Sequence, residues 1–305
     1  MKQKVALVLS GGGARGIAHI GVIEELEKRG FEITAIAGTS MGAVVGGVYV
    51  LGKMEEYKEW LSSLDKFGVF GLFDFTLSWQ GFVKGDKVFN RMKEYISDGN
   101  IEDMRIPFAA VAADIIKKKE VVFTSGSVFN AIRASVSIPT VFTPVKHGDG
   151  LLVDGGVMNN IPVNHVRRTK GDILVVVNVN ADIPVQKKPV SKKEEERRES
   201  VYQKKVREFY AHVQELVHPG NNDKKDTGEE ARKKKAQEHL DLFNLINRTL
   251  GSMTYTIAQM RLEQHKPDIL VEISVDSCGL FDFYKAEEMV EIGRHAAALE
   301  VDKFK

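Results

Sequence analysis

The sequence predicts an α/β fold in three layers, with a mainly parallel β-sheet and helices on both of its faces. Two observations indicate this class. The N-terminal part of the chain alternates strand and helix patterns, and such βαβα units build parallel sheets. The chain has 305 residues, of which 43% are hydrophobic and 28% charged, enough for one large core. We therefore expect a single domain spanning residues 1–305.

Four segments make up this βαβα start. Val5–Leu9 is a short apolar run typical of a buried parallel strand. Ile17–Lys28 carries apolar residues at helical spacing with charged residues between them, and Gly30 follows where helices commonly end. Ile33–Ala37 is the second strand. Ala43–Leu51 is small and apolar on all sides, which predicts a buried helix.

Later segments extend the sheet and close the domain. Short apolar runs predict further strands, and the last segment of the chain has helical periodicity. The predicted strands are Phe108–Ala113, Glu120–Phe123, Leu151–Val153, Ile173–Val179 and Ile269–Val275, and the predicted last helix is Lys285–Leu299.

Two regions depart from this regular pattern. Phe67–Val83 contains five phenylalanines, Trp79 and several glycines. It fits an acyl pocket or a lipid-facing lid, and it fits equally well ordinary core packing around a loop. Residues 186–238 carry 15 basic and 11 acidic residues and few large apolar ones, which favours a solvated charged insertion over a basic arm for a membrane or a partner.

Charge and cysteine content exclude several classes of protein. The formal net charge is +1, and no aromatic platform or known module for nucleic acid is present, so we expect no nucleic-acid partner. Cys278 is the single cysteine, which excludes a disulfide framework, and we interpret it as structural. The N-terminal apolar run is shorter than a signal sequence, and no stretch approaches the ~20 residues of a membrane span. We expect a cytoplasmic protein, with room for transient peripheral contact with a membrane surface.

The first chemical motif is a glycine-rich loop that follows a strand and opens a helix. Glycines let the backbone approach a ligand closely, and the N–H groups at a helix N-terminus favour negative charge. Such a loop suits a phosphate or the oxyanion that forms during acyl transfer. Its spacing also fits a dinucleotide-binding turn. The loop consists of Gly11, Gly12, Gly13, Ala14, Arg15 and Gly16.

The second motif, GTSMG, distinguishes between these functions. Gly38 to Gly42 matches the nucleophile elbow G-x-S-x-G, which places Ser40 on a strained strand-to-helix turn. Glycine is needed at both ends because larger side chains would collide with the neighbouring strand and helix. A dinucleotide site would instead need an acidic residue at the end of the second strand, and Glu32 lies at its start.

An activated serine needs a base, and Asp154 is the better candidate. It ends the strand Leu151–Val153 and begins the DGG turn with Gly155 and Gly156. An aspartate at the carboxyl end of a strand points into the same edge crevice as Ser40. A Ser–Asp–His order can be built only with His165 or His295, and neither follows a late strand on a clear loop.

GGGARG, GTSMG and DGG, in this order, resemble the three marks of the patatin-like phospholipase family. The segment Ala134–Pro139 also resembles that family's block before the catalytic aspartate. The similarity runs from Val5 to about Asp182 and resumes from about Met253 to Ala298. The chain departs from the family in the insertion and in the DGG turn, where other members carry alanine last. We expect the second difference to be harmless on steric grounds.

This resemblance implies hydrolysis of acyl esters of lipids by a Ser–Asp dyad, without metal or other cofactor. By position, Ser40 is the nucleophile and Asp154 the base, and the backbone N–H groups of the glycine loop form the oxyanion hole. Arg15 matches the family's basic position, and we interpret its role as bracing the loop. No calcium site is visible in the acidic residues. The alternatives are a small-ester or lysophospholipid esterase, a transacylase, or a non-catalytic lipid-binding regulator.

Overall fold

The computed structural model describes residues 2–66, 68–69, 86–139, 141–185 and 242–304. The chain divides into two compact units, one of residues 1–186 with 249–305 and the other of residues 187–248. The second unit contains most of the predicted insertion, and of it only the first turns of helix α9 are described. The account below concerns the first unit.

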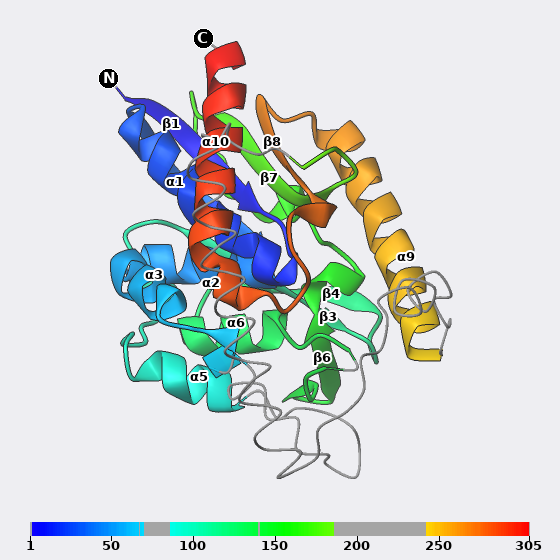
Figure 1. The fold of residues 1–305 in the computed structure, drawn as a ribbon. Coiled ribbons are helices and arrows are strands. Elements are labelled where there is room, and N and C mark those ends of the chain that lie inside the picture. The colour runs from blue at the N-terminus through cyan, green and yellow to red at the C-terminus, as the bar shows by residue number, and fades with distance from the viewer. Residues whose placement is uncertain (1, 67, 70–85, 140, 186–241, 305) are drawn as a thin grey trace, which may run out of the picture. The chain divides into compact units, whose positions relative to one another are not determined.

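The first unit is built on one eight-stranded sheet in the order β5-β6-β3-β2-β1-β7-β8, with β4 paired to β3 (Figure 1). Its strands are β1 Gln3–Leu9, β2 Phe31–Thr39, β3 Phe108–Asp114, β4 Lys119–Phe123, β5 Val145–His147, β6 Gly150–Asp154, β7 Ile173–Ala181 and β8 Ile269–Ser274. The helices are α1 Ala18–Lys28, α2 Met41–Val50, α3 Met54–Ser62, α5 Asp86–Lys93, α6 Val128–Ser135, α9 Leu242–His265 and α10 Ala286–Phe304.

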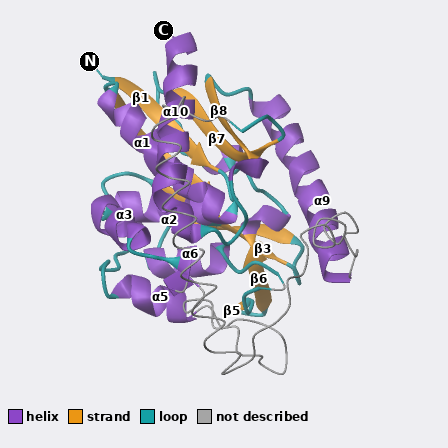
Figure 2. Ribbon diagram, viewed as in Figure 1, coloured by secondary structure: helices purple, strands orange, loops and turns teal. Residues whose placement is uncertain are grey.

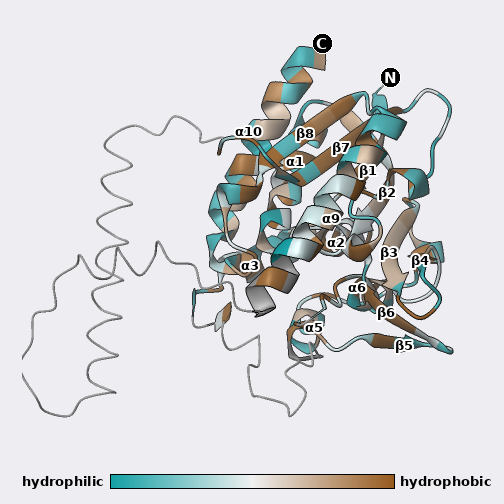
Figure 3. Cartoon of the chain, turned by 90° about the vertical axis from the view of Figure 1, so that its right-hand side faces the viewer, coloured by the Kyte–Doolittle hydropathy of each residue, from teal (hydrophilic) through white to brown (hydrophobic). Residues whose placement is uncertain are grey.

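Most of the sheet is parallel, as predicted. β3, β2, β1, β7 and β8 run in one direction, because each pairs in parallel with its neighbour. The short strands β4, β5 and β6 pair antiparallel. The central strands are mostly apolar (Figure 3), as expected for strands that are buried on both faces.

Helices cover both faces of this sheet, which confirms the predicted three-layer α/β class (Figure 2). Side chains of β1 alternate between two clusters: Val5, Leu7 and Leu9 join the large core formed with α1, α2, α6 and α10. Ala6 and Val8 join a smaller cluster on the opposite face, which is completed by residues 161–166 and by residues 258 and 262 of α9. The larger core thus lies on the face of the sheet that is covered by α2, the helix that begins directly after Ser40.

None of the described helices contains a stretch that is both long and apolar enough to cross a bilayer.

Candidate active site

Ser40 lies on a strained turn between β2 and α2. Its backbone has φ 53° and ψ −123°, a left-handed conformation that costs a non-glycine residue of order 1–3 kcal/mol. The flanking glycines are required by close backbone approach: a Cβ on Gly38 would lie 2.4 Å from the Gly42 carbonyl oxygen. A Cβ on Gly42 would lie 2.2 Å from the Leu9 carbonyl oxygen. Only glycine at both positions lets the helix start directly against β1 and β2.

The backbone of Ser40 is held by a serine that the motifs did not single out as functional. The Ser40 N–H donates to Ser135 Oγ at 2.8 Å, and the Ser135 hydroxyl donates to the Val111 carbonyl at 2.6 Å. Ser135 is completely buried in the last turn of α6. It therefore ties the elbow to β3 through two hydrogen bonds.

Asp154 reaches Ser40 by a route that the sequence did not predict. β6 is not a parallel strand: it runs antiparallel to β3, with Asp154 opposite Ala112. β2 pairs with β3 up to Val111, while β4 pairs along Ala110–Asp114. Since a strand has only two edges, β2 and β6 share the second edge of β3 and meet end to end. The carboxyl ends of two opposed strands thus bring Ser40 and Asp154 together.

The Asp154 carboxyl group is buried and only partly hydrogen bonded. The residue is 7% exposed, and its Oδ1 accepts the Gly156 N–H at 2.7 Å. Oδ2 accepts no hydrogen bond from any described residue. Burial raises the pKa of Asp154 to about 6, against the smaller lowering effects of the Ser40 hydroxyl and the Gly156 N–H. Asp154 is therefore a stronger base than an ordinary aspartate and faces the serine hydroxyl.

The turn after Asp154 is tightly packed. A Cβ on Gly155 would lie 2.2 Å from the Val111 carbonyl oxygen, so a side chain there would push β6 away from β3. At Gly156 a Cβ would lie 3.0 Å from the side-chain oxygens of Asn160 and Asp154. Alanine at this last position would thus need small shifts of neighbouring atoms, whereas the glycine of this chain makes no such contact.

Two of the four predicted oxyanion donors are already engaged within the protein. The Gly11 N–H donates to the Asn160 carbonyl at 3.1 Å, and the Ala14 N–H donates to the Leu280 carbonyl at 2.9 Å. For the N–H groups of Gly12 and Gly13, the described residues supply no acceptor. The expected set of four donors is thereby reduced to these two, at the start of a short 3₁₀ turn over Gly13–Ile17.

Side chains at the end of β7 hold the glycine loop in place. The Gly11 carbonyl accepts the Asn180 side-chain amide at 2.6 Å. The Arg15 guanidinium donates to the carbonyls of Val179 and Cys278, both at 3.2 Å, and to Asn180 Oδ1 at 2.9 Å. All three acceptors lie in the protein rather than toward a substrate, so the geometry gives Arg15 a bracing role.

The next position of the loop, Gly16, leaves room for the elbow helix. A Cβ there would lie 2.5 Å from Cγ of Met41, the first residue of α2.

Histidine and cysteine lie elsewhere. His165 Nε2–H donates to Glu120 at 2.5 Å and does not line the cavity at Ser40. His19 is fully buried, donates from Nε2 to the Ser10 carbonyl at 2.8 Å, and burial lowers its pKa to about 4. Burial raises the pKa of the Cys278 thiol to about 11, which leaves it protonated and structural. Within the described residues, no group of three or more histidine, cysteine or acidic side chains is placed to hold a metal ion.

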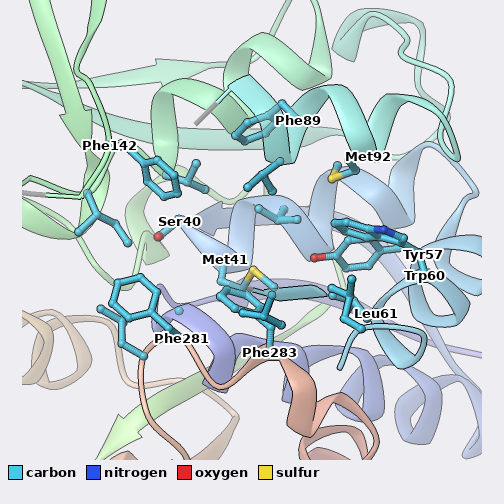
Figure 4. A pocket seen from close by; sticks show the side chains of 18 residues that line it. Ser40, Met41, Tyr57, Trp60, Leu61, Phe89, Met92, Phe142, Phe281 and Phe283 are labelled. Carbon is cyan, nitrogen blue, oxygen red and sulfur yellow. The ribbon is translucent and has the colours of Figure 1, made fainter. Parts of the chain in front are cut away.

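Ser40 opens into an apolar cavity of about 760 Å³, counting its mouth to solvent (Figure 4). The lining residues are Gly13, Ser40, Met41, Val44, Tyr57, Trp60, Leu61, Leu64, Val69, Val88, Phe89, Met92, Val136, Ile138, Phe142, Leu280, Phe281 and Phe283. Val69 belongs to the predicted phenylalanine-rich segment; the rest of that segment, with Trp79, falls outside the described residues apart from Gly68.

The end of α6 and the residues just after it hold the main chains of both Ser40 and Asp154. Besides Ser135, which holds Ser40, the Ser137 carbonyl accepts the Asp154 N–H at 2.9 Å. These serines lie in the segment Ala134–Pro139, which resembles a block of the family, but no role was predicted for them. The pairing of Asn160 and Asn180 with Gly11 had no sequence signal, because those contacts span more than a hundred residues.

Comparison with known proteins places the chain in a family. The family model of patatin-like phospholipases matches residues 7–167, which hold the glycine loop, the elbow and the DGG turn. An uncharacterized NTE family protein of Mycobacterium bovis is 29% identical over 99% of this chain and 92% of its own length. Lysophospholipase nte1 of Emericella nidulans is 30% identical over 59% of this chain, which is 12% of that protein. VipD from Legionella pneumophila aligns over 99% of this chain and 67% of that one, at 14% identity and a TM-score of 0.45. The chain belongs to the patatin-like phospholipase family.

Proposed function

We propose that this protein is a serine acyl hydrolase that cleaves ester bonds of phospholipids or related lipids with a Ser40–Asp154 dyad. One observation carries the proposal: Ser40 lines an apolar cavity on one side and faces a buried carboxylate of raised pKa on the other. A hydrophobic acyl chain fits the first surface, and proton removal needs the second.

In the proposed acylation step, Asp154 accepts the Ser40 hydroxyl proton as Oγ attacks the ester carbonyl carbon. The carbonyl oxygen becomes an oxyanion, and the N–H groups of Gly12 and Gly13 donate to it, helped by the N-terminal end of α2 that begins at Met41. When the tetrahedral intermediate collapses, the carbon–oxygen bond to the alcohol breaks. Asp154 returns the proton to the leaving alkoxide, and the acyl group stays on Ser40.

Deacylation repeats this sequence with water. Asp154 takes a proton from the water molecule that attacks the acyl carbon, the oxyanion forms again on the same donors, and the fatty acid leaves as Ser40 recovers its proton. An aspartate without a histidine is a weak base for this work. Its burial among apolar atoms compensates in part, because desolvation raises the pKa of Asp154 to about 6.

A lipid with one acyl chain is the substrate class that we favour within this proposal. The cavity at Ser40 is lined almost wholly by apolar side chains, so its interior suits a hydrocarbon chain and not a charged head group. One similar protein is named a lysophospholipase, which is an enzyme acting on such lipids. A small-ester esterase or a transacylase would use the same dyad and differ only in the acceptor or the length of the chain.

The test combines labelling and turnover. A fluorophosphonate probe should modify wild-type protein at Ser40, located by peptide mass spectrometry, and should not modify the Ser40→Ala variant. The wild type should release fatty acid from lysophosphatidylcholine, and Asp154→Asn should lose at least a hundredfold in kcat on the activated ester p-nitrophenyl butyrate. Wild-type turnover by Asp154→Asn would remove Asp154 from the mechanism. Absence of an adduct on folded wild type would favour the non-catalytic lipid-binding regulator.

A further inference from the structure

The apolar cavity contains a tyrosine hydroxyl that the hydrolysis mechanism does not use. Tyr57, on α3, is 2% exposed and lines the cavity together with Ser40. Figure 4 shows its hydroxyl directed toward the interior of the cavity. No described residue gives or accepts a hydrogen bond with this hydroxyl, and the hydroxyl is not one of the fully buried polar atoms, so it is accessible from the cavity. A phenol thus lies in a hydrocarbon-lined site without a partner among the described residues.

Leaving such a group unpaired is costly. When an apolar chain fills the cavity, a hydroxyl left there without a hydrogen bond costs about 1–3 kcal/mol, and phenylalanine would occupy the same space without that cost. The ring alone would preserve the packing, since it contacts Trp60 with ring centroids 5.7 Å apart. Burial raises the pKa of Tyr57, so the hydroxyl stays protonated and can donate a hydrogen bond. The missing partner is therefore an acceptor that enters the cavity with the ligand.

We propose that Tyr57 selects acyl chains that carry an oxygen substituent, a hydroxyl or keto group, part-way along the hydrocarbon. The cavity begins at Ser40, where the ester carbon must lie, and the rest of its lining is apolar, so the group that meets Tyr57 belongs to the acyl chain. A charged head group would be desolvated there without a counter-charge. This inference rests on the proposed acyl hydrolysis at Ser40 and names its substrate class.

The experiment uses p-nitrophenyl esters of one chain length, unsubstituted or with a keto group at successive carbons. Wild type should prefer one keto position over the plain chain by about three- to tenfold in kcat/KM, the worth of one hydrogen bond. Tyr57→Phe should abolish that preference, so that the substituted and plain chains react with the same kcat/KM. Tyr95→Phe is the matched control: this exposed ring stacks on Trp60 and does not line the cavity, so the preference should survive.

The inference is overturned if no keto position is preferred by wild type, or if Tyr57→Phe keeps the preference. Failure of the proposed hydrolysis has a different signature: wild type would then hydrolyse none of the esters and would take up no fluorophosphonate on Ser40.

An independent feature lies at the turn between β3 and β4. Residues 115–119, with the sequence Ile-Ile-Lys-Lys-Lys and here named the β3–β4 tip, are all exposed. The two isoleucines are 42% and 61% exposed. Lys117 pairs with Asp149, whereas Lys118, Lys119 and the neighbouring Lys146 of β5 have no ion-pair partner among the described residues. Exposed apolar side chains thus lie next to a group of lysines, of which Asp149 compensates only part of the charge.

We infer that the β3–β4 tip docks on an anionic lipid surface. Val111 of β3 pairs with Thr39, the residue before Ser40. β3 continues for three more residues in the same direction, to Asp114, so the tip projects beyond the end of β2 where Ser40 lies. Isoleucines can enter the boundary between head groups and acyl chains while lysines contact lipid phosphates. An acidic protein or nucleic acid would use the lysines alone and leave the isoleucines without a role.

Binding to vesicles tests this surface without any need for turnover. Wild type should co-sediment with vesicles of phosphatidylcholine and phosphatidylglycerol at equal parts, weakly with pure phosphatidylcholine, and less as salt rises. Ile115→Ser with Ile116→Ser should weaken binding, and Lys118→Glu should weaken it at least about fivefold. Lys266→Glu is the control, since Lys266 is another exposed lysine with positive φ. Unchanged binding in the isoleucine variant, or an equal loss in Lys266→Glu, contradicts the inference.

Discussion

Replacing Asp154 by asparagine should stabilise the fold while it abolishes turnover. Burial raises the pKa of Asp154 from 3.8 to about 6, so the folded protein binds this proton more tightly than the unfolded chain does. Stability must then fall as the pH rises between these two values. At about 1.4 kcal/mol for each pKa unit, the ionised carboxylate costs the native state about 3 kcal/mol above pH 7. Asparagine has the shape of the protonated acid and carries no charge.

The variant should therefore exceed wild type in free energy of unfolding by about 3 kcal/mol at pH 8 and by about 1 kcal/mol at pH 4.5. The Gly156 N–H keeps its acceptor, since the amide oxygen of asparagine can take the place of Oδ1. Urea titrations followed by circular dichroism at both pH values measure the difference. Glu32→Gln serves as the control, because it makes the same change from acid to amide at an exposed position of β2. A variant no more stable at pH 8 than at pH 4.5, relative to wild type, would refute the burial argument.

Three further predictions follow from the same geometry. Because Asp154 must be ionised to accept a proton, kcat/KM on a soluble ester should rise tenfold per pH unit below about 6 and level off above it; a profile flat from pH 4.5 to 8 contradicts this. Arg15→Ala should lose about 2–4 kcal/mol of stability and lower kcat more than it raises KM, because three hydrogen bonds to the loop's support disappear; unchanged melting and kcat would show that the guanidinium does not brace the loop. Gly42→Ala should lose more than about 3 kcal/mol or fail to fold, because its Cβ would overlap the Leu9 carbonyl, whereas Gly251→Ala in α9, with open space around it, should be neutral or stabilising in thermal melts.

The core of the fold could be predicted because its signals are local. The predicted strands Val5–Leu9 and Ile33–Ala37 correspond to β1 and β2, and the apolar segment after the elbow corresponds to α2. These segments are buried, so their hydrophobic pattern decides their structure. α6 was not predicted, although Ser127 is a capping signal at its start: the Ser127 side chain accepts the Asn130 N–H. The helix is only eight residues long, which is too short for hydrophobic periodicity to identify it as a helix.

The direction of β6 could not be read from its own residues, because an apolar strand looks the same in either direction. The informative signal was the connection before it. β5 and β6 form a hairpin in which His147 pairs with Gly150, and Gly148 turns the chain with φ 60°. A glycine and an aspartate between two short strands indicate such a hairpin, and an antiparallel strand follows from it. The occupied donors of the glycine loop had no such signal, because Asn160 and Leu280 are distant in sequence.

The end of α6 and the residues just after it support the main chains of Ser40 and Asp154: Ser135 Oγ holds Ser40, and the Ser137 carbonyl holds Asp154. A small displacement of this segment, by thermal motion or by a mutation, should therefore move Ser40 and Asp154 in the same direction. Their mutual spacing is the quantity that proton transfer needs, and it is shielded from movements that shift the pair as a whole. Substitutions on the outer helices should thus be far better tolerated than a substitution that breaks the contact of Ser40 or of Asp154 with this segment.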